Sequence, residues 1–179
     1  MTAIDGRVTA DSLQTDIAPN LHINDIIQIS TVESNSHQEP RTEIDSHSNM
    51  TVIGHHSRII HDTGKTAQVS PFTNTYEALQ SVPIVDAAIA YDCPFTDQTF
   101  ILVCTNALSI PTMSHNLIPP FILREAGVTV NDVPKIQVHT PSIEHHSLYF
   151  PAADRRIPLA LWVIFSYFSC RSPTDKEID

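Results

Sequence analysis

Ile44-Asp45-Ser46-His47 is the stretch of this chain that decides its fold. Ile44 leads directly into Asp45, a pattern that places a carboxylate at the point where a buried strand ends. A second apolar strand is expected at Met50–Ile53. Asp45 is therefore expected in a short connection between two strands.

A second module follows about seventy residues later, from Pro111 to Ile118 with Leu123–Gly127 after it, and an apolar strand and a short helix are expected there. The helix is expected because Pro suits a first helical turn and Gly suits the position just after a helix. The residues assigned to it are the possible caps Ser114 and Asn116, the first-turn residues Pro119 and Pro120, the apolar residues Phe121, Ile122 and Ala126, and the terminal Gly127.

Short apolar runs recur every eight to twelve residues after Arg41, with Pro, Asn, Asp or Thr between them. This spacing is typical of an all-β sandwich or barrel. A hairpin turn is expected at Pro94–Gln98. The runs are Met50–Ile53, Arg58–Ile60, Thr66–Val69, Val82–Ala90, Thr99–Cys104, Leu108–Ile110, Gln137–His139 and Ile157–Phe168.

The chain divides into a domain with two flanking segments. Residues 1–40 are polar apart from one possible strand at Leu21–Ile29, and they are expected to be a flexible N-terminal segment or linker. Residues 41–172 form the domain, and 173–179 form a tail.

Composition excludes several classes of function. Ten Lys and Arg stand against 20 Asp and Glu, a net charge of −10 without a basic stripe, so nucleic-acid binding by this chain alone is not expected. The longest apolar stretch, Leu159–Phe168, is too short to span a bilayer, which predicts no membrane association. Three cysteines without paired spacing indicate a reducing, cytoplasmic setting.

These motifs together resemble the protease segment of copia-type LTR retrotransposon polyproteins. The resemblance covers about residues 43–172 and rests on Asp45-Ser46, on Asn106–Pro111, and on His115-Asn116-Leu117-Ile118 with Leu123 and Gly127 after it. Family members have Gly after Asp-Ser, whereas this chain has His47. It is more closely similar to a divergent branch, found in copia-like elements of diatoms and related microbes, that carries Asp-Ser-His.

The resemblance implies a retropepsin-like closed β-barrel or sandwich with one short helix, acting as a homodimer. It implies an aspartic endopeptidase that processes its own Gag-Pol-type polyprotein, in the cytoplasm or within a retroelement particle, and that needs no cofactor. Each subunit supplies one Asp of a dyad, since two carboxylates in close contact share one proton. Asp45 is the expected catalytic residue, and Ser46 is expected to tie the two active-site loops together.

Asp62-Thr63-Gly64 is the alternative position of the catalytic motif. His61 and Lys65 flank it where apolar or small residues are usual, and Asp-Thr-Gly also makes an ordinary turn between strands. The layout therefore favours Asp45 over Asp62. Residues 70–90 fall where the family has its flap, a hairpin that closes over substrate.

Two other functional classes remain open at this point. A catalytically inactive module could keep the fold and the dimer interface for binding, because His47 replaces the usual Gly. A His/Asp metal-dependent hydrolase is the other, although no recognised metal motif is present, so no metal site is assigned. Its candidate ligands are Asp45, His47, His55, His56, His61 and Asp62.

The apolar run near the C-terminus also has two interpretations. A continuous apolar run is most simply a core strand. The alternative is a subunit interface that buries Trp162, Phe165, Tyr167 and Phe168.

Overall fold

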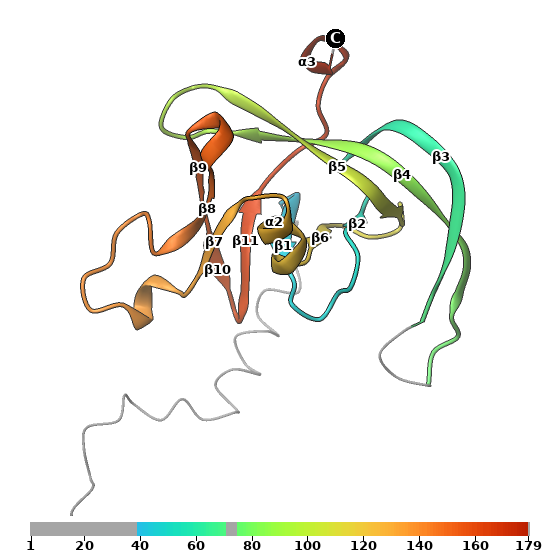
Figure 1. Ribbon diagram of the computed structural model, residues 1–179, viewed down its shortest axis with the longest axis horizontal. Coiled ribbons are helices and arrows are strands. Elements are labelled where there is room, and N and C mark those ends of the chain that lie inside the picture. The colour runs from blue at the N-terminus through green and yellow to red at the C-terminus, as the bar shows by residue number, and fades with distance from the viewer. Residues whose placement is uncertain (1–38, 71–74, 179) are drawn as a thin grey trace, which may run out of the picture. The chain divides into compact units, whose positions relative to one another are not determined.

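The computed structural model describes residues 39–70 and 75–178 (Figure 1). All of these residues belong to one unit of the chain, His37–Asp179. The strand expected at Leu21–Ile29 and most of the expected linker lie outside the described residues.

Strands dominate the described residues, so the prediction of an all-β fold is confirmed. The strands are β1 (Arg41–Ile44), β2 (Val52–Ile53), β3 (Arg58–Val69), β4 (Leu79–Asp92), β5 (Thr99–Ser109), β6 (Asn116–Ile118), β7 (Thr129–Asp132), β8 (His146–Phe150), β9 (Arg155–Pro158), β10 (Ala160–Trp162) and β11 (Phe165–Ser169). Two short α-helices, rather than the single one expected, occur in the described part: α2 (Pro120–Glu125) and α3 (Asp175–Ile178). The 3-10 helices are η2 (Lys135–Gln137) and η3 (Pro151–Ala153).

The described strands form two sheets that do not close into a barrel, so the expectation of a closed barrel is wrong. Eight strands lie in the order β10-β11-β1-β6-β2-β5-β4-β3, and three lie in the order β7-β8-β9. Closure would require β10 to pair with β3, but both are edge strands. Three register shifts in the pairing of β3 with β4 bend this edge, and such bulges also discourage pairing with another chain.

The strand that organises the site is β6, which lies between β1 and β2. It runs parallel to β1 and antiparallel to β2. β11 pairs with the other side of β1. Every residue of β1 is buried, as expected for a strand with neighbours on both sides.

The main apolar core joins the two sheets. Ile53, Ile89, Leu148 and Phe168 are among its largest fully buried side chains, and they come from β2, β4, β8 and β11. Phe168 is therefore a core residue. Phe165, in contrast, remains 36% exposed.

Several strand boundaries differ from those predicted. Asp62-Thr63-Gly64 does not separate two strands but lies within the continuous strand β3, where a bulge absorbs the extra residues. Ile157–Phe168 divides among β9, β10 and β11, because the chain reverses after Trp162. Gln137–His139 is not a strand, since Gln137 ends η2. The turn at Pro94–Gln98 is confirmed by a 2.8 Å hydrogen bond from the Cys93 N–H to the Gln98 carbonyl.

Helix α2 begins at Pro120 without the cap predicted from Ser114 or Asn116. Its N-cap is Pro119, which offers no side-chain hydrogen bond. Gly127 follows the helix with φ +81°, as expected. The buried face differs from the prediction, because a six-residue helix turns only Pro120 and Leu123 inward and leaves Phe121 45% exposed. Ala126 is also exposed.

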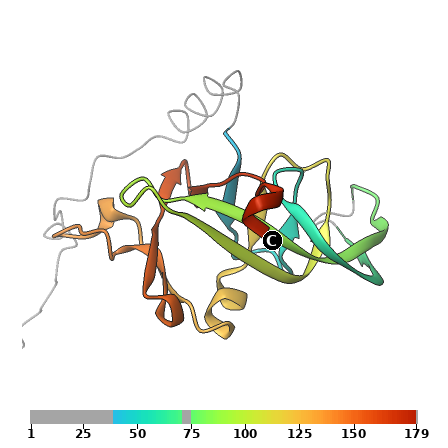
Figure 2. The same cartoon turned by 90° about the horizontal axis from the view of Figure 1, so that it is seen from above.

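The C-terminal residues lie near β3 and β4 (Figure 2), and they form ion pairs with residues of both strands. Arg171 exchanges two backbone hydrogen bonds with Ala90 and binds both carboxylate oxygens of Asp92 at 2.7 and 2.8 Å. The same guanidinium holds the pKa of Glu177 at about 2. A further ion pair joins Arg58 to Asp175 of α3.

Val163 occupies the turn between β10 and β11 with φ +56°. This left-handed conformation is strained for a β-branched residue. Replacing Val163 by Gly is expected to stabilise the domain by about 1 kcal/mol, because the relief of strain exceeds the added entropy of an unfolded glycine. Urea denaturation measures the difference.

Val133→Gly is the matched control, because Val133 is also exposed but has no positive φ. It is expected to leave stability unchanged or to lower it. Equal effects of the two substitutions would show that the Val163 backbone is not strained.

Candidate active site

Asp45 follows the last residue of β1 directly and lies in the connection to β2. Its N–H donates a hydrogen bond to the Ile118 carbonyl at the end of β6 (3.2 Å). Its carboxylate accepts a hydrogen bond from the His47 N–H (2.9 Å), and its side chain is 20% exposed. The carboxylate is thus fixed by backbone at the rim of the sheet, in reach of solvent.

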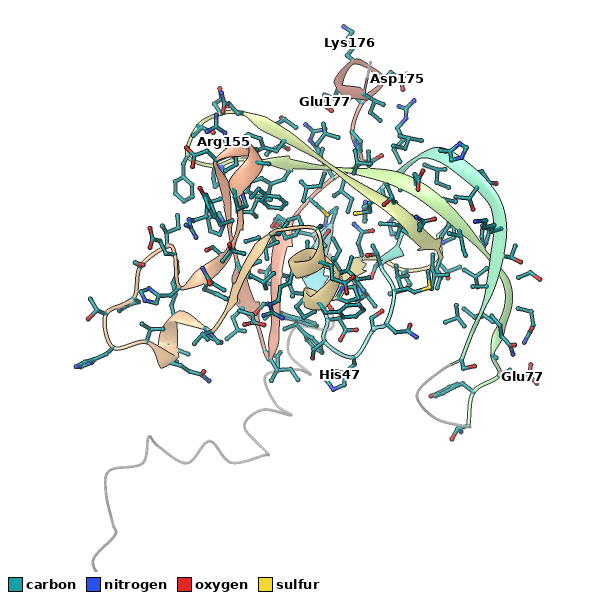
Figure 3. All side chains as sticks on the ribbon, in the orientation of Figure 1. His47, Glu77, Arg155, Asp175, Lys176 and Glu177 are labelled. Carbon is teal, nitrogen blue, oxygen red and sulfur yellow. The ribbon has the colours of Figure 1, made fainter. Side chains whose placement is uncertain are left out.

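Ser46 and His47 both face solvent. The His47 side chain is 86% exposed, and its Nδ1 lies 3.6 Å from Asp45 Oδ1. Figure 3 shows His47 projecting from the end of this loop, away from the sheet. Within the described residues, the Ser46 hydroxyl has no hydrogen-bond partner.

Asp62 occupies a different environment. It lies on the edge strand β3 and is exposed, and its carboxylate accepts a hydrogen bond from the Gly64 N–H (2.9 Å). Four strands separate β3 from β1 in the sheet order, which at strand spacing corresponds to roughly 24 Å across the sheet. The two Asp motifs of one chain therefore do not form a common site.

Asn116 holds the segments around the Asp45 loop together. This side chain is fully buried, and its Oδ1 accepts a hydrogen bond from the Gly54 N–H (2.8 Å). Its Nδ2 donates to Thr42 Oγ1 (3.2 Å) and lies 3.6 Å from Cys170 Sγ. One amide therefore links β6 to β1 and to the ends of β2 and β11.

The sequence predicted Asn116 as a possible helix cap and missed this role. The fit around it is tight, since a Cβ on Gly54 would lie 2.5 Å from the Met113 carbonyl oxygen and 2.8 Å from that of His115. Gly54 directly after the predicted strand Met50–Ile53 was the available signal, because a glycine at such a position marks a close approach of backbones.

A buried ionic group lies on β1, the strand that ends directly before Asp45. The Arg41 guanidinium donates to Glu43 Oε1 at 2.7 Å, and both side chains are less than one tenth exposed. His115 Nε2 lies 3.6 Å from the other Glu43 oxygen, and the Arg41 guanidinium stands 4.1 Å above the Trp162 ring. Alternation along β1 places Arg41 and Glu43 on one face, and Asp45 follows directly after the strand ends.

His146 and Ser166 form a second buried polar contact, between β8 and β11. His146 Nε2 and Ser166 Oγ are 2.8 Å apart, and both residues are buried. Burial lowers the pKa of His146 below its ordinary value of 6.5, and the nearby Lys135 adds to this effect. This pair bridges the sheets and is closed to substrate.

The lowered pKa of His146 makes stability depend on pH. The unfolded imidazole binds a proton as pH falls below about 6.5, whereas the folded one stays neutral to a lower pH. The unfolded state then binds more protons, so stability decreases as pH falls through this window. His146→Gln is expected to reduce this loss of stability. The free energy of unfolding of the unaltered protein should therefore exceed that of the variant by less at pH 5 than at pH 7.5.

Urea denaturation at the two pH values measures the advantage. All other titrating groups are common to both proteins and cancel in the comparison. A stability difference that stays constant between pH 7.5 and 5 would contradict the assignment of a neutral buried His146.

Of the segment predicted as a flap, 70–90, the structure describes residues 70 and 75–90, which include most of β4. Tyr76 at this end is 70% exposed. Figure 3 shows Glu77, near Tyr76, and His47 of the Asp45 loop both toward the lower side of the molecule.

The described residues offer no metal site, no reactive Cys104 thiol and no membrane-spanning helix. They include no group of three or more His, Cys, Asp or Glu side chains placed to hold a metal ion. Burial raises the pKa of Cys104 to about 12, so this thiol stays protonated and unreactive. None of the helices in the described part is long and apolar enough to cross a membrane.

Comparison with known proteins identifies no relative of this chain: no family model, curated protein or solved structure matches it.

Proposed function

We propose that the chain is a retropepsin-like aspartic endopeptidase in which Asp45 is the catalytic carboxylate. The observation that carries this proposal is the position of Asp45 in the fold. Asp45 lies in the connection from β1 to β2, strand β6 lies between these two strands in the sheet, and α2 follows β6 in the chain. An Asp-Ser loop backed by a later apolar strand and a short helix is what the resemblance to copia-type proteases implies.

The reaction requires two carboxylates that share one proton. The ionised carboxylate removes a proton from a water molecule, whose oxygen attacks the scissile carbonyl carbon. The protonated carboxylate donates a hydrogen bond to the carbonyl oxygen, where negative charge develops. When the tetrahedral intermediate collapses, the C–N bond breaks and the amine nitrogen takes up a proton. Because Asp62 lies far across the sheet, the second carboxylate is assigned to Asp45 of a second copy.

Two features beside Asp45 suit contact with a second copy. The Ser46 hydroxyl is exposed and can donate a hydrogen bond across a two-fold axis. The β10–β11 turn lies at the same end of the sheet, because Ile44 pairs with Ser166, and it exposes Leu161, Ile164 and Phe165. No charged residue occurs in 157–170, so two chains of net charge −10 meet there without repulsion between side chains.

The proposed substrate is the polyprotein to which such a protease segment belongs. The β3–β4 hairpin is the proposed flap, since it is long, it has an exposed end and it lies on the side of the Asp45 loop. Closure of such a hairpin excludes water from the reacting groups.

A catalytically inactive binding module is the second candidate, and His47 is the observation that favours it. Its imidazole is 86% exposed and stands 3.6 Å from the Asp45 carboxylate. A module of this kind keeps the dimer and lacks cleavage.

Incubation of the purified protein with an unfolded protein substrate between pH 4 and 7 tests the proposal. We expect cleavage that is blocked by a statine-containing peptide, that is unaffected by EDTA, and whose specific activity rises with protein concentration as dimers form. A folded dimer, established by sedimentation velocity, that cleaves nothing at any pH would favour the binding module. Loss of activity in EDTA would favour a metal-dependent hydrolase.

A further inference from the structure

A cavity of about 450 Å³ lies between β5, α2 and the β8–β9 hairpin, and the proposed peptidase does not use it. This volume falls within the range of roughly 300–1,000 Å³ that small-molecule sites occupy. Its walls are mainly apolar, with side chains from all three elements: Phe100, Leu102, Ile122, Leu123, Phe150 and Ile157. Such a lining suits a hydrocarbon chain.

Arg155 is the one charged residue among those that line the cavity. Its Nη1 donates to the Asp154 carbonyl at 3.1 Å, and its guanidinium lies 5.8 Å from the Phe100 ring. Figure 3 shows it at the end of the β8–β9 hairpin.

Arg155 differs from most other arginines of the described region in having no carboxylate partner there. Four others each form an ion pair with Asp or Glu: Arg41, Arg58, Arg124 and Arg171. In a chain with twice as many acidic as basic residues, a cation without an acidic partner at the rim of an apolar cavity can bind an external anion.

We propose that this cavity binds a medium-chain fatty acid, with the hydrocarbon chain along the apolar walls and the carboxylate on Arg155. The two parts of the ligand match the two parts of the site. Guanidinium binds carboxylate with two parallel hydrogen bonds, and the apolar lining removes the chain from water. The proposal does not depend on Asp45 or on catalysis.

Fluorescence of 11-(dansylamino)undecanoic acid, titrated with the full-length protein, tests binding directly. We expect probe emission to rise and to be displaced by decanoate. Arg155→Gln is expected to weaken decanoate binding about tenfold, the loss that corresponds to one charge-assisted hydrogen bond. Decanol, which has the same chain length but no charge, is expected to bind the unaltered protein and Arg155→Gln equally.

Two further variants complete the test. Arg156→Gln is the matched control, because Arg156 neighbours Arg155 but does not line the cavity and instead binds Ser147 Oγ. It is expected to bind decanoate as the unaltered protein does. Ala126→Trp places an indole at an exposed lining position and is expected to abolish probe binding without lowering the melting temperature.

No change in probe emission with the folded protein would overturn the proposal. Equal decanoate affinity of the unaltered protein and Arg155→Gln would also overturn it. An equal loss of decanoate affinity in Arg155→Gln and Arg156→Gln would do the same, because either result shows that Arg155 is not the carboxylate partner.

Discussion

Replacing Asp45 by Asn is expected to lower the rate of peptide cleavage by at least about 1,000-fold, whereas Asp62→Asn leaves it within about twofold. A general acid or a general base typically raises a reaction rate by about 100- to 10,000-fold. The substitution removes both at once, since a homodimer carries Asp45 twice. Asn keeps the shape of the side chain and an oxygen that accepts the His47 N–H, so the loop is retained.

The comparison of Asp45→Asn with Asp62→Asn is internally controlled. Both aspartates accept a hydrogen bond from the N–H two residues later, at 2.9 Å in each case, so the local structural cost of the two substitutions is similar. Cleavage rates of both variants show which aspartate is needed for catalysis, and their melting temperatures show whether each variant is folded. Loss of activity in Asp62→Asn alone would move the catalytic site to β3, and full activity in Asp45→Asn would end the peptidase assignment of that residue.

Replacing Asn116 by Leu is expected to destabilise the domain by about 3 kcal/mol. Leu fills a similar volume but leaves the buried Gly54 N–H without an acceptor, which costs about 1–3 kcal/mol. It also removes the hydrogen bond to the Thr42 hydroxyl. Urea denaturation followed by circular dichroism measures the free energy of unfolding.

Asn131→Leu is the matched control, because Asn131 makes one hydrogen bond to the Glu144 carbonyl near the surface. Its expected cost is below about 1 kcal/mol. Similar losses in the two variants would show that Asn116 is an ordinary hydrogen-bonded residue and does not link four segments.

The local features of the site were predictable from the sequence. The sequence places Asp45 between two strands, because polar turn residues separate Ile44 from the apolar run Met50–Ile53. Such a pattern is compatible with few other local structures. Gly127 after α2 followed from the same kind of local rule, since its left-handed backbone suits glycine.

The long-range features were not predictable, because nothing in β1 or β2 specifies that β6 lies between them. The role of Asn116 also depends on three residues from distant segments, which a single sequence does not connect. The sequence predicts one apolar run where the structure has three short strands, since apolar residues continue through the reversal at Val163, where turns usually carry Gly or Asn.

Insertion of β6 between β1 and β2 also has a consequence for when the site forms during synthesis. Thr42 contacts Asn116, 74 residues later, and Cys170, 128 residues later. Contacts of such sequence separation form slowly, because the intervening chain must be ordered first. The Asp45 loop can therefore acquire its native support only after nearly the whole domain has left the ribosome, so a nascent chain carries the Asp-Ser motif long before it has a structured site.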